Sequence, residues 1–334
     1  MPLVEEIGER RVIEIILRCL DAMPGVPVPL GDDASAVDMG DGRLAVIKTD
    51  MLVGKTDIPP GMTLRQAARK AVVMNVSDLA AKGVRPVAVL SSLGIPRGLT
   101  EEDVEEIGGG LNEGAREYGA YVLGGDTNEA SDLVISCTAF GTCEKGRFVR
   151  RDGARPGDLV AVTGQFGMAA AGLRILLENL SAPPGIKDAL VDAVLVPRAR
   201  LREGLALART GEVTASIDSS DGLAWSLHEI SRSSRVGFFV DALPIAHEAE
   251  EFAEARGIDP VELALYGGEE YELVVTVRPR GWRRVKEAMR RVGTPITKIG
   301  VVTEEPTLLF KTEGRVVPIE PRGWEHFKTT GRLR

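Results

Sequence analysis

A carboxylate inside an apolar helical segment constrains the fold of this chain more than any other feature. The segment over residues 63–83 begins with Thr63 as its N-cap, has helical periodicity and ends at Gly83. Asp78 stands in it among valines, alanines and a leucine that belong in a core. A charge moved into a dry interior must be paired, bound to a metal or neutralised. The segment therefore predicts a buried helix whose carboxylate has a specific partner.

The sequence alone leaves the partner of Asp78 open. Asn75, Asp78 and Lys82 share one helix face at i, i+3 and i+4 spacing, so Asp78 could pair with Lys82 on a solvated stripe. In the other interpretation, Asp78 leans out of its helix into a cation site built with residues from elsewhere in the chain.

Composition places the chain among globular proteins and excludes several classes. At 334 residues, with 44% hydrophobic and 27% charged residues, it is long enough for two domains with real cores. No apolar run is long enough for a bilayer and the N-terminus lacks a signal peptide, so we expect a cytoplasmic protein and no membrane partner. Three cysteines without a CxxC and three distant histidines predict no zinc site. The net charge of −8 disfavours nucleic acid as a partner.

Strands and helices alternate in both halves of the chain, which predicts two α/β or α+β domains with a boundary near residue 150. In the first half, helices are expected at 4–22, 63–83 and 100–119, and strands at 43–50, 85–95, 120–128 and 132–143. In the second half we expect helices at 167–180, 197–211 and 281–293, a strand, polar turn and helix over 214–234, and a hairpin around Glu313-Gly314. The three glycines at 108–110 indicate that another segment packs very close to their helix.

Acidic residues recur at the ends of the apolar strands or in the turns beside them. Strand ends are where open α/β sheets bind ligands, and carboxylate and hydroxyl oxygens suit magnesium better than zinc or copper. These positions are Asp32, Asp33, Thr49, Asp50, Asp126, Asp218 and Asp221. Each also has a local interpretation as a turn residue or a helix cap.

The segment around Lys55 is not a Walker A loop, because that pattern would require a glycine at position 49.

Taken in order, these segments resemble the thiamine-monophosphate kinase family, which belongs to the superfamily of aminoimidazole ribonucleotide synthetase. The matching motifs run nearly end to end: "LGDDASAV", "KTDML", "NVSDLAAKGVRP", "LGGDTN", "RDGARPGD", "TGQFGMAAAGL", "IDSSDGL", "YGGEEYEL" and "GWEHF". The resemblance implies an N-terminal α/β domain over residues 1–150, which would bind ATP and metal. It also implies a C-terminal α+β domain over 151–334, which would complete the nucleotide and substrate site.

The resemblance assigns roles to individual positions. The metal ligands would be Asp33, Thr49, Asp50, Asp78, Asp126, Asp218 and Asp221. The nucleotide contacts would be Gly125, Asp126, Arg151 and Ser220, and the substrate contacts would be Asp57, Glu269 and Trp324. Asp57 stands where bacterial members often have a histidine, and Lys48 stands where a serine often helps to hold a metal.

The implied activity is ATP-dependent phosphorylation of thiamine monophosphate to the diphosphate, by a homodimer with several Mg²⁺ ions. Because both substrates are polyanions and the chain is acidic, we expect Mg²⁺ to bridge carboxylates and phosphates. Arg151, Asp78 and Asp126 would stabilise charge during direct in-line transfer, without a phosphoenzyme or a general base. The rival interpretations are an aminoimidazole ribonucleotide synthetase-like enzyme and a non-catalytic nucleotide- or metal-binding protein.

Overall fold

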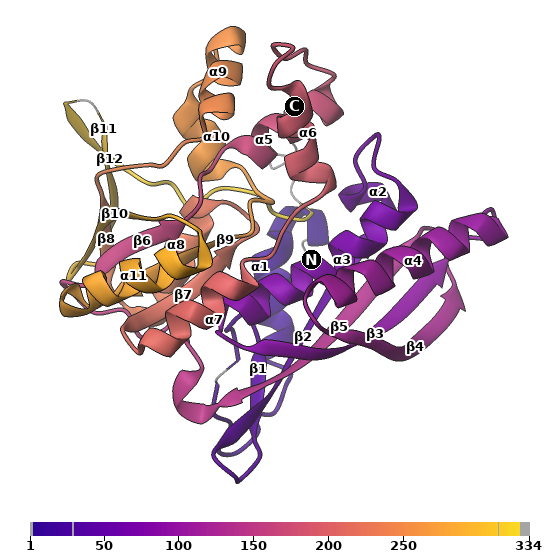
Figure 1. Cartoon of the computed structure of the whole chain (residues 1–334), viewed down its shortest axis with the longest axis horizontal. Coiled ribbons are helices and arrows are strands. Elements are labelled where there is room, and N and C mark those ends of the chain that lie inside the picture. Colours follow the sequence, from indigo (N-terminus) through magenta and orange to yellow (C-terminus); the bar gives the residue numbers. More distant parts are fainter. Residues whose placement is uncertain (1–2, 29, 313, 328–334) are drawn as a thin grey trace.

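Two β-sheets, one in each half of the chain, organise the fold (Figure 1). The computed structural model describes residues 3–28, 30–312 and 314–327. The N-terminal sheet has the strand order β1-β2-β5-β3-β4, in which only β3 and β4 are parallel. Its strands are β1 (Ser35–Asp38), β2 (Arg43–Val53), β3 (Arg85–Ile95), β4 (Tyr121–Glu129) and β5 (Val134–Glu144).

The C-terminal sheet is larger and also mostly antiparallel. Its order is β12-β11-β8-β10-β6-β9-β7, with β11 and β8 as its parallel pair. Its strands are β6 (Leu159–Thr163), β7 (Val213–Ser219), β8 (Gly237–Val240), β9 (Glu272–Val277), β10 (Ile296–Thr303), β11 (Leu308–Thr312) and β12 (Arg315–Pro318).

Helices pack around both sheets. In the first half they are α1 (Val4–Leu17), α2 (Gly54–Asp57), α3 (Leu64–Ala81) and α4 (Glu101–Glu117), followed by the 3₁₀ turn η1 (Lys145–Arg147). In the second half they are α5 (Met168–Glu178), α6 (Lys187–Leu195), α7 (Leu201–Thr210), α8 (Leu223–Ser234), α9 (His247–Arg256), α10 (Pro260–Tyr266) and α11 (Trp282–Val292), with the 3₁₀ turn η2 (Pro279–Gly281). None of the described helices is long and apolar enough to cross a bilayer.

Helix α3 is the central helix of the molecule. Thr63 caps it as predicted, and Gln66 completes a reciprocal capping box. One side of α3 packs on β2 and β5 of the N-terminal sheet, and another packs on α7 and β7 of the second half. Helix α3 is therefore buried nearly all round, and its polar residues near Asp78 face the junction of the two halves rather than solvent.

The expected elements agree with the structure in type, with differences at their ends. The hairpin of β11 and β12 is present around Gly314, while Glu313 lies outside the described residues. The prediction for the first helix is wrong at its end, because α1 stops at Leu17. Gly8 also interrupts α1 with a φ of 72°, a left-handed value that glycine adopts at little cost.

Two of the three glycines of α4, Gly109 and Gly110, lie in close contact with Arg65 of α3, which agrees with the close packing that the sequence predicts. A Cβ at Gly110 would lie 2.1 Å from the carbonyl oxygen of Arg65, which is backbone and cannot move aside. A Cβ at Gly108 would meet no atom within 4 Å. The two positions therefore differ in packing although they lie in the same helix.

We expect Gly110→Ala to lower the free energy of unfolding by about 1–3 kcal/mol, because the added methyl group forces α4 away from α3. Gly108→Ala is the matched control and should raise stability by about 1 kcal/mol through helix propensity alone. Thermal and urea unfolding of both variants measure the difference. Equal effects at the two positions would contradict the close contact.

Candidate functional site

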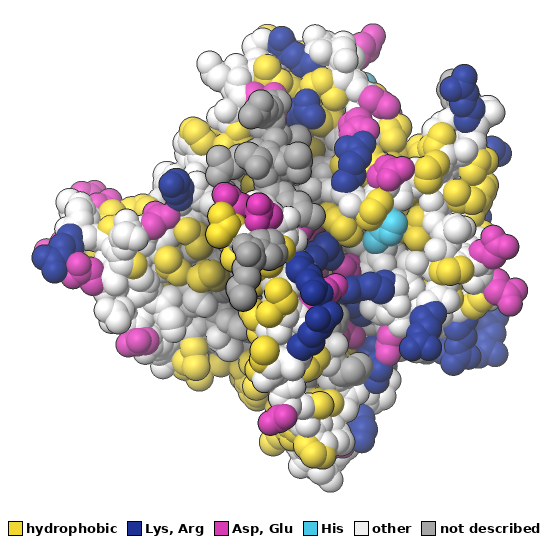
Figure 2. Space-filling view, turned by 180° about the vertical axis from the view of Figure 1, so that it is seen from behind, with side chains coloured by type: hydrophobic (Ala, Val, Ile, Leu, Met, Phe, Trp, Pro, Cys, Tyr) yellow, Lys and Arg dark blue, Asp and Glu magenta, His cyan; other side chains and the backbone are white. Residues whose placement is uncertain are grey.

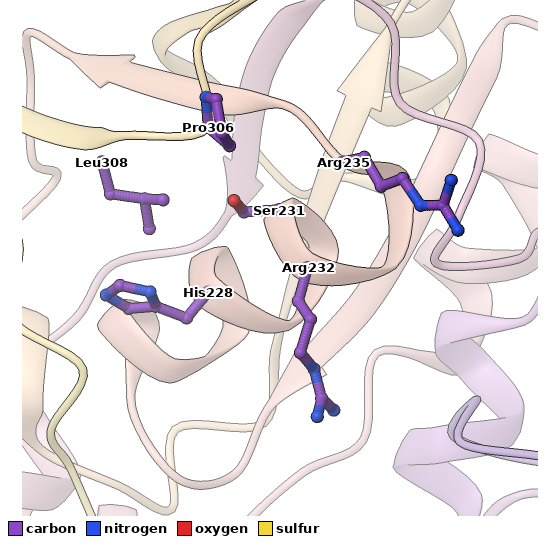
Figure 3. Close-up of a pocket in the computed structure, with 6 residues that line it drawn as sticks. All are labelled: His228, Ser231, Arg232, Arg235, Pro306 and Leu308. Carbon is purple, nitrogen blue, oxygen red and sulfur yellow. The ribbon is translucent and has the colours of Figure 1, made fainter.

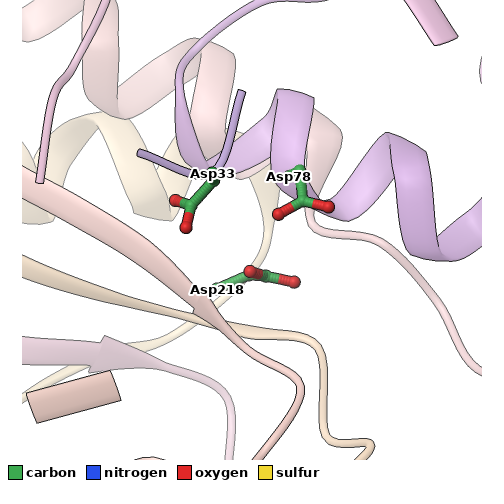
Figure 4. Close-up of side chains that lie close together, drawn as sticks. All are labelled: Asp33, Asp78 and Asp218. Atoms are coloured by element: carbon green, nitrogen blue, oxygen red, sulfur yellow. The ribbon is translucent and has the colours of Figure 1, made fainter. Parts of the chain in front are cut away.

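Three buried aspartates from distant parts of the chain meet where the two halves join (Figure 4). Asp33 lies in the loop before β1, Asp78 lies near the end of α3, and Asp218 lies near the end of β7. One carboxylate oxygen of each lies within 4.8 Å of the others. We call these three residues the acidic group. Among the described residues, no other set of three histidine, cysteine or acidic side chains comes this close.

Neighbouring hydroxyl groups fix Asp218 in the acidic group. Ser77 of α3 donates a hydrogen bond of 2.6 Å to the Asp218 carboxylate. Ser226 of α8 donates one of 3.1 Å to the Asp218 carbonyl oxygen. Because Ser77 directly precedes Asp78, the same turn of α3 that supplies one carboxylate also holds another in place.

Lys82 joins the acidic group to both halves of the chain. Its side chain is completely buried, and its ammonium lies 2.7 Å from an Asp32 oxygen and 2.6 Å from an Asp33 oxygen. It also donates a 2.6 Å hydrogen bond to the carbonyl oxygen of Ser216 in β7. The interpretation in which Lys82 pairs with Asp78 on a solvated stripe is therefore wrong, because the end of α3 is buried and Lys82 extends toward the Asp32-Asp33 loop.

Lys48 of β2 is the cation that contacts Asp78. Its ammonium lies 3.0 Å from an Asp78 oxygen and 3.1 Å from an Asp50 oxygen. Burial alone would lower the pKa of Lys48, but the charges of Asp78 and Asp50 outweigh burial and raise it. Asp50 therefore lies at the edge of the acidic group, joined to Asp78 through the Lys48 ammonium.

Arg151 contacts the acidic group from the start of the second half. Its guanidinium pairs with Asp33 and donates a 2.8 Å hydrogen bond to the carbonyl oxygen of Gly31. Its backbone N–H donates to an Asp32 carboxylate oxygen at 3.1 Å. Glu229 of α8 lies 3.5 Å from the guanidinium on another side. Arg151 is therefore held beside the carboxylates from several directions.

Arg10 of α1 continues this network. It pairs with Glu229, lies 3.9 Å from an Asp221 oxygen and stacks 3.5 Å from the centre of the Trp225 ring. Helix α1 lies at the back of the view in Figure 1, and the face seen from behind in Figure 2 shows Lys and Arg side chains gathered beside Asp and Glu. Positive side chains thus border the carboxylates on this face.

The carboxylates outnumber the cationic side chains that touch them. Burial raises the pKa of both Asp78 and Asp218 above the ordinary value, and neighbouring carboxylates add to the effect. Counted in their ionised forms, five carboxylates stand against three cationic side chains, which leaves two negative charges: Asp32, Asp33, Asp50, Asp78 and Asp218 against Lys48, Lys82 and Arg151. Asp221 and Glu229 do not change this balance, because Arg10 and Arg232 accompany them. An all-oxygen set with this excess charge fits a hard divalent cation such as Mg²⁺.

A second cluster of predicted residues lies on the turns after β7 and before β9. The Glu269 N–H donates to the carbonyl oxygen of Ser220 at 2.6 Å, and the Trp324 N–H donates to that of Asp221 at 3.0 Å. Glu269 has a φ of 65°, which is rare for a residue with a side chain and marks a turn that its surroundings hold in place. These bonds bring the predicted substrate residues beside the predicted nucleotide residue Ser220.

Lys70 of α3 connects this second cluster to the first half. Its ammonium is almost fully buried, 2.5 Å from a Glu269 oxygen and 3.2 Å from the carbonyl oxygen of Asp57. The Asp57 carboxylate accepts the Val53 N–H at 2.7 Å and so closes the turn of α2. The two predicted substrate residues from different halves thus share one buried lysine.

Three predicted site residues lie apart from the acidic group. The Thr49 hydroxyl bonds to the Cys137 carbonyl oxygen and the Thr138 hydroxyl, and alternation along β2 places it opposite Lys48 and Asp50. Asp126 of β4 is exposed and pairs with Ser92 of β3. The same row of the sheet continues through β5 to the exposed Met51 of β2, so Asp126 lies on the exposed face. Gly125 lies in the next row, where a Cβ would collide with the Ser91 carbonyl oxygen.

A shallow depression of about 450 Å³ lies away from these clusters (Figure 3). His228, Ser231, Arg232 and Arg235 of α8 and the turn after it line it together with residues before β11. The His228 ring bonds to the Ile319 carbonyl oxygen, which is a structural contact. The depression includes none of the predicted site residues.

Comparison with known proteins agrees with this arrangement. The model of the AIR synthase related protein, N-terminal domain, matches residues 31–143, and that of the C-terminal domain matches residues 155–311. A thiamine-monophosphate kinase of Pyrococcus horikoshii is 39% identical over 90% of this chain and 91% of its own length. The chain belongs to the thiamine-monophosphate kinase family. The kinase of Bacillus subtilis is 33% identical over 91% of this chain and 94% of its own.

A solved structure extends the likeness to the whole fold. The protein described as "AaThiL complexed with AMPPCP and TMP" superposes with a TM-score of 0.85 at 31% identity, over 98% of this chain and 99% of its own. The family and the two-domain fold expected from the sequence motifs are thereby confirmed. The domain boundary near residue 150 and the roles of the individual site residues stay predictions.

Sequence reasoning missed the buried lysines and Ser77. Lys70 and Lys82 both stand in the helix that the sequence predicts to be buried, so the argument applied to Asp78 applied to them as well. A buried lysine requires a carboxylate or carbonyl partner from another segment. That signal was present, but it does not specify which segment supplies the partner.

We expect Lys82→Met to lower the free energy of unfolding by about 3–5 kcal/mol in the metal-free protein, because it leaves the buried Asp32 carboxylate without its nearest cation and Asp33 with Arg151 alone. The double variant Lys82→Met/Asp32→Asn should recover part of this loss. Lys145→Met removes the exposed pair with Asp38 and should cost less than about 1 kcal/mol. Equal losses for Lys82→Met and Lys145→Met in urea unfolding would disprove the buried contact.

Proposed function

We propose that the protein transfers the γ-phosphoryl group of ATP to thiamine monophosphate and forms thiamine diphosphate. The observation that carries this proposal is the acidic group beside Arg151, at the junction of two halves that both belong to the family fold. Membership of the thiamine-monophosphate kinase family supports the substrate. The likeness to a protein solved with AMPPCP and TMP supports the pair of phosphate-bearing ligands.

The metal would be Mg²⁺, held by the acidic group, with further ions arriving together with the phosphates. When bound, Mg²⁺ neutralises charge between carboxylates and phosphate oxygens. Asp33, Asp78 and Asp218 provide the oxygens that the structure brings together. Asp50 and Asp221 are the proposed ligands for the further ions, whereas the Thr49 and Asp126 side chains lie on the other face of the N-terminal sheet.

Arg151 would stabilise charge on the transferring phosphoryl group. Its planar guanidinium offers paired N–H donors, which suit phosphate oxygens better than an ammonium does. The present contacts with Asp33 and Glu229 hold it at the acidic group. Ser220, on the turn after β7, is the further proposed nucleotide contact, whereas Gly125 and Asp126 lie apart from the acidic group. Because positioning and charge stabilisation supply most of the catalysis in phosphoryl transfer, we propose direct in-line transfer without a phosphoenzyme.

Glu269, Asp57 and Trp324 would bind thiamine monophosphate. Lys70 holds the first two of these in one arrangement through contacts with the Glu269 carboxylate and the Asp57 carbonyl oxygen. The Trp324 ring would provide an aromatic face for the cationic thiazolium, a contact worth about 1–2 kcal/mol when desolvated. The cytoplasmic location stays a prediction from sequence.

An ADP-release assay distinguishes the proposed reaction from its rivals. With ATP and Mg²⁺, we expect ADP and thiamine diphosphate from thiamine monophosphate, and no comparable turnover with thiamine or with an aminoimidazole precursor. Ring closure of the precursor would favour a synthetase. Tight ATP binding without ADP release in the presence of thiamine monophosphate would favour a non-catalytic protein.

We expect Asp78→Asn to lower kcat by about 10²–10³-fold, a loss of the size seen when one preorganised charge-stabilising group is removed. Excess Mg²⁺ at millimolar concentration should not restore the rate. Asp38→Asn, which changes an exposed carboxylate paired with Lys145, is the control and should leave kcat unchanged. Near-normal activity of Asp78→Asn would remove Asp78 from the mechanism.

We also propose that the protein is a homodimer that pairs through the outer face of its N-terminal sheet. Helix α3 covers the other face (Figure 1), while the outer face exposes large apolar side chains in three alternate rows of the ladder. These are Ile47, Met51, Leu90, Tyr121 and Phe140. Exposed apolar surface marks interaction sites, and twofold pairing is the commonest assembly. A second copy packed there would also cover Thr49 and Asp126.

Sedimentation velocity tests this assembly. We expect a dimer for the unaltered chain and a monomer for Met51→Asp, because a carboxylate buried in the interface, in the same row as Asp126, is left unpaired. Leu177→Asp changes an equally exposed apolar residue on α5 and should remain dimeric. A monomeric unaltered chain, or a dimeric Met51→Asp, would refute the proposed interface.

A further inference from the structure

Lys48 occupies an unusual place beside the acidic group. It projects from the inner face of β2, together with Asp50 two residues later. Its ammonium lies almost equally far from two carboxylates, 3.1 Å from Asp50 and 3.0 Å from Asp78. Asp78 uses one of its oxygens for this contact and belongs to the acidic group as well. The ammonium therefore bridges two carboxylates, one from β2 and one from α3.

The same arrangement occurs a second time in the site. Lys82 bridges Asp32 and Asp33 at 2.7 and 2.6 Å and is completely buried. The two lysines reach the carboxylates from different elements, one from β2 and the other from the end of α3. Lysine ammonium groups thus provide fixed positive charge at two separate edges of the acidic group.

The charge balance limits how many divalent cations the free site can hold. Two negative charges remain when the three cationic side chains are counted against the five carboxylates. One divalent cation neutralises them. A second divalent cation between Asp50 and Asp78 would have to displace the ammonium of Lys48 or lie directly against it, and like charges this close repel strongly.

We propose that Lys48 is a built-in cation of this chain: its ammonium takes the position between Asp50 and Asp78, so the nucleotide-free protein binds one divalent cation, in the acidic group, instead of two. This inference rests on the proposed metal-dependent function. Its consequence is that the bridge between β2 and α3 carries one fixed charge, which does not depend on the concentration of free metal.

Counting bound Mn²⁺ in the nucleotide-free protein tests the proposal without any activity measurement. Calorimetry and the electron paramagnetic resonance of free Mn²⁺ both give the number of ions per chain. We expect one ion for the unaltered chain and two for Lys48→Met, which keeps most of the length of the side chain and removes its charge. Lys48→Arg keeps the charge and should bind one. Lys145→Met removes an exposed lysine of the same domain and should also bind one.

Stability gives a second readout, which remains useful where Lys48→Met folds poorly. Without metal, Lys48→Met should melt at a lower temperature than the unaltered chain. Saturating Mg²⁺ should raise the melting temperature of Lys48→Met by more than it raises that of the unaltered chain. Lys48→Gln provides a second neutral variant for the same comparison. An additional bound ion in either neutral variant supports the proposal.

Two Mn²⁺ ions in the unaltered chain would overturn the proposal directly, and two results for Lys48→Met would overturn it as well. One is a single Mn²⁺ in Lys48→Met with unchanged affinity, which would make Lys48 irrelevant to metal binding. The other is a single Mn²⁺ bound more tightly, which would make Lys48 a competitor that the metal displaces. Failure of the proposed function gives a different pattern. If the unaltered chain binds no Mn²⁺ and Lys48→Met binds one, Lys48 still occupies the position between Asp50 and Asp78. In that case the acidic group binds no metal, and the proposed metal-dependent function fails.

Discussion

The structure depends on the compensation of buried carboxylates by cations at the junction of its two halves. Asp33, Asp78 and Asp218 come from a loop, a helix and a strand, and each would be costly to bury alone. Lys82 and Arg151 offset part of their charge and tie the first half to β7 and α8. Removing one partner of such a buried set leaves an uncompensated charge, so the electrostatic network constrains both the fold and the site.

The same network explains how two separately organised sheets form one site. Helix α3 carries Lys70, Ser77, Asp78 and Lys82 on or near its surface toward the second half. Through them it contacts both the acidic group and the turn that holds Glu269. A change in the angle between the halves would alter both clusters together. The proposed nucleotide and substrate sites are therefore coupled by one helix rather than by a flexible linker.

The sequence predicted the elements well and the site in part. The structure brings Asp78 close to Asp33 and Asp218, as expected for a charge in an apolar helix and for acidic residues beside strands, and their roles as ligands stay predictions. The cation beside Asp78 could not be derived, since Lys48 comes from another segment, β2, and Lys82 contacts Asp32 and Asp33 instead. Thr49 and Asp126 were expected beside Asp50, but strand alternation and ladder register place their side chains on the exposed face. Periodicity within one strand is visible in a sequence, whereas register between strands is not.

The central claim is that a divalent cation binds among Asp33, Asp78 and Asp218. Anomalous diffraction from a crystal grown with Mn²⁺, a non-hydrolysable ATP analogue and thiamine monophosphate measures this directly. The account predicts an anomalous peak within coordination distance of oxygens from all three carboxylates, about 2.0–2.3 Å for a small divalent cation. Peaks confined to the phosphates, with the three carboxylates bound only to lysine and arginine, would contradict it.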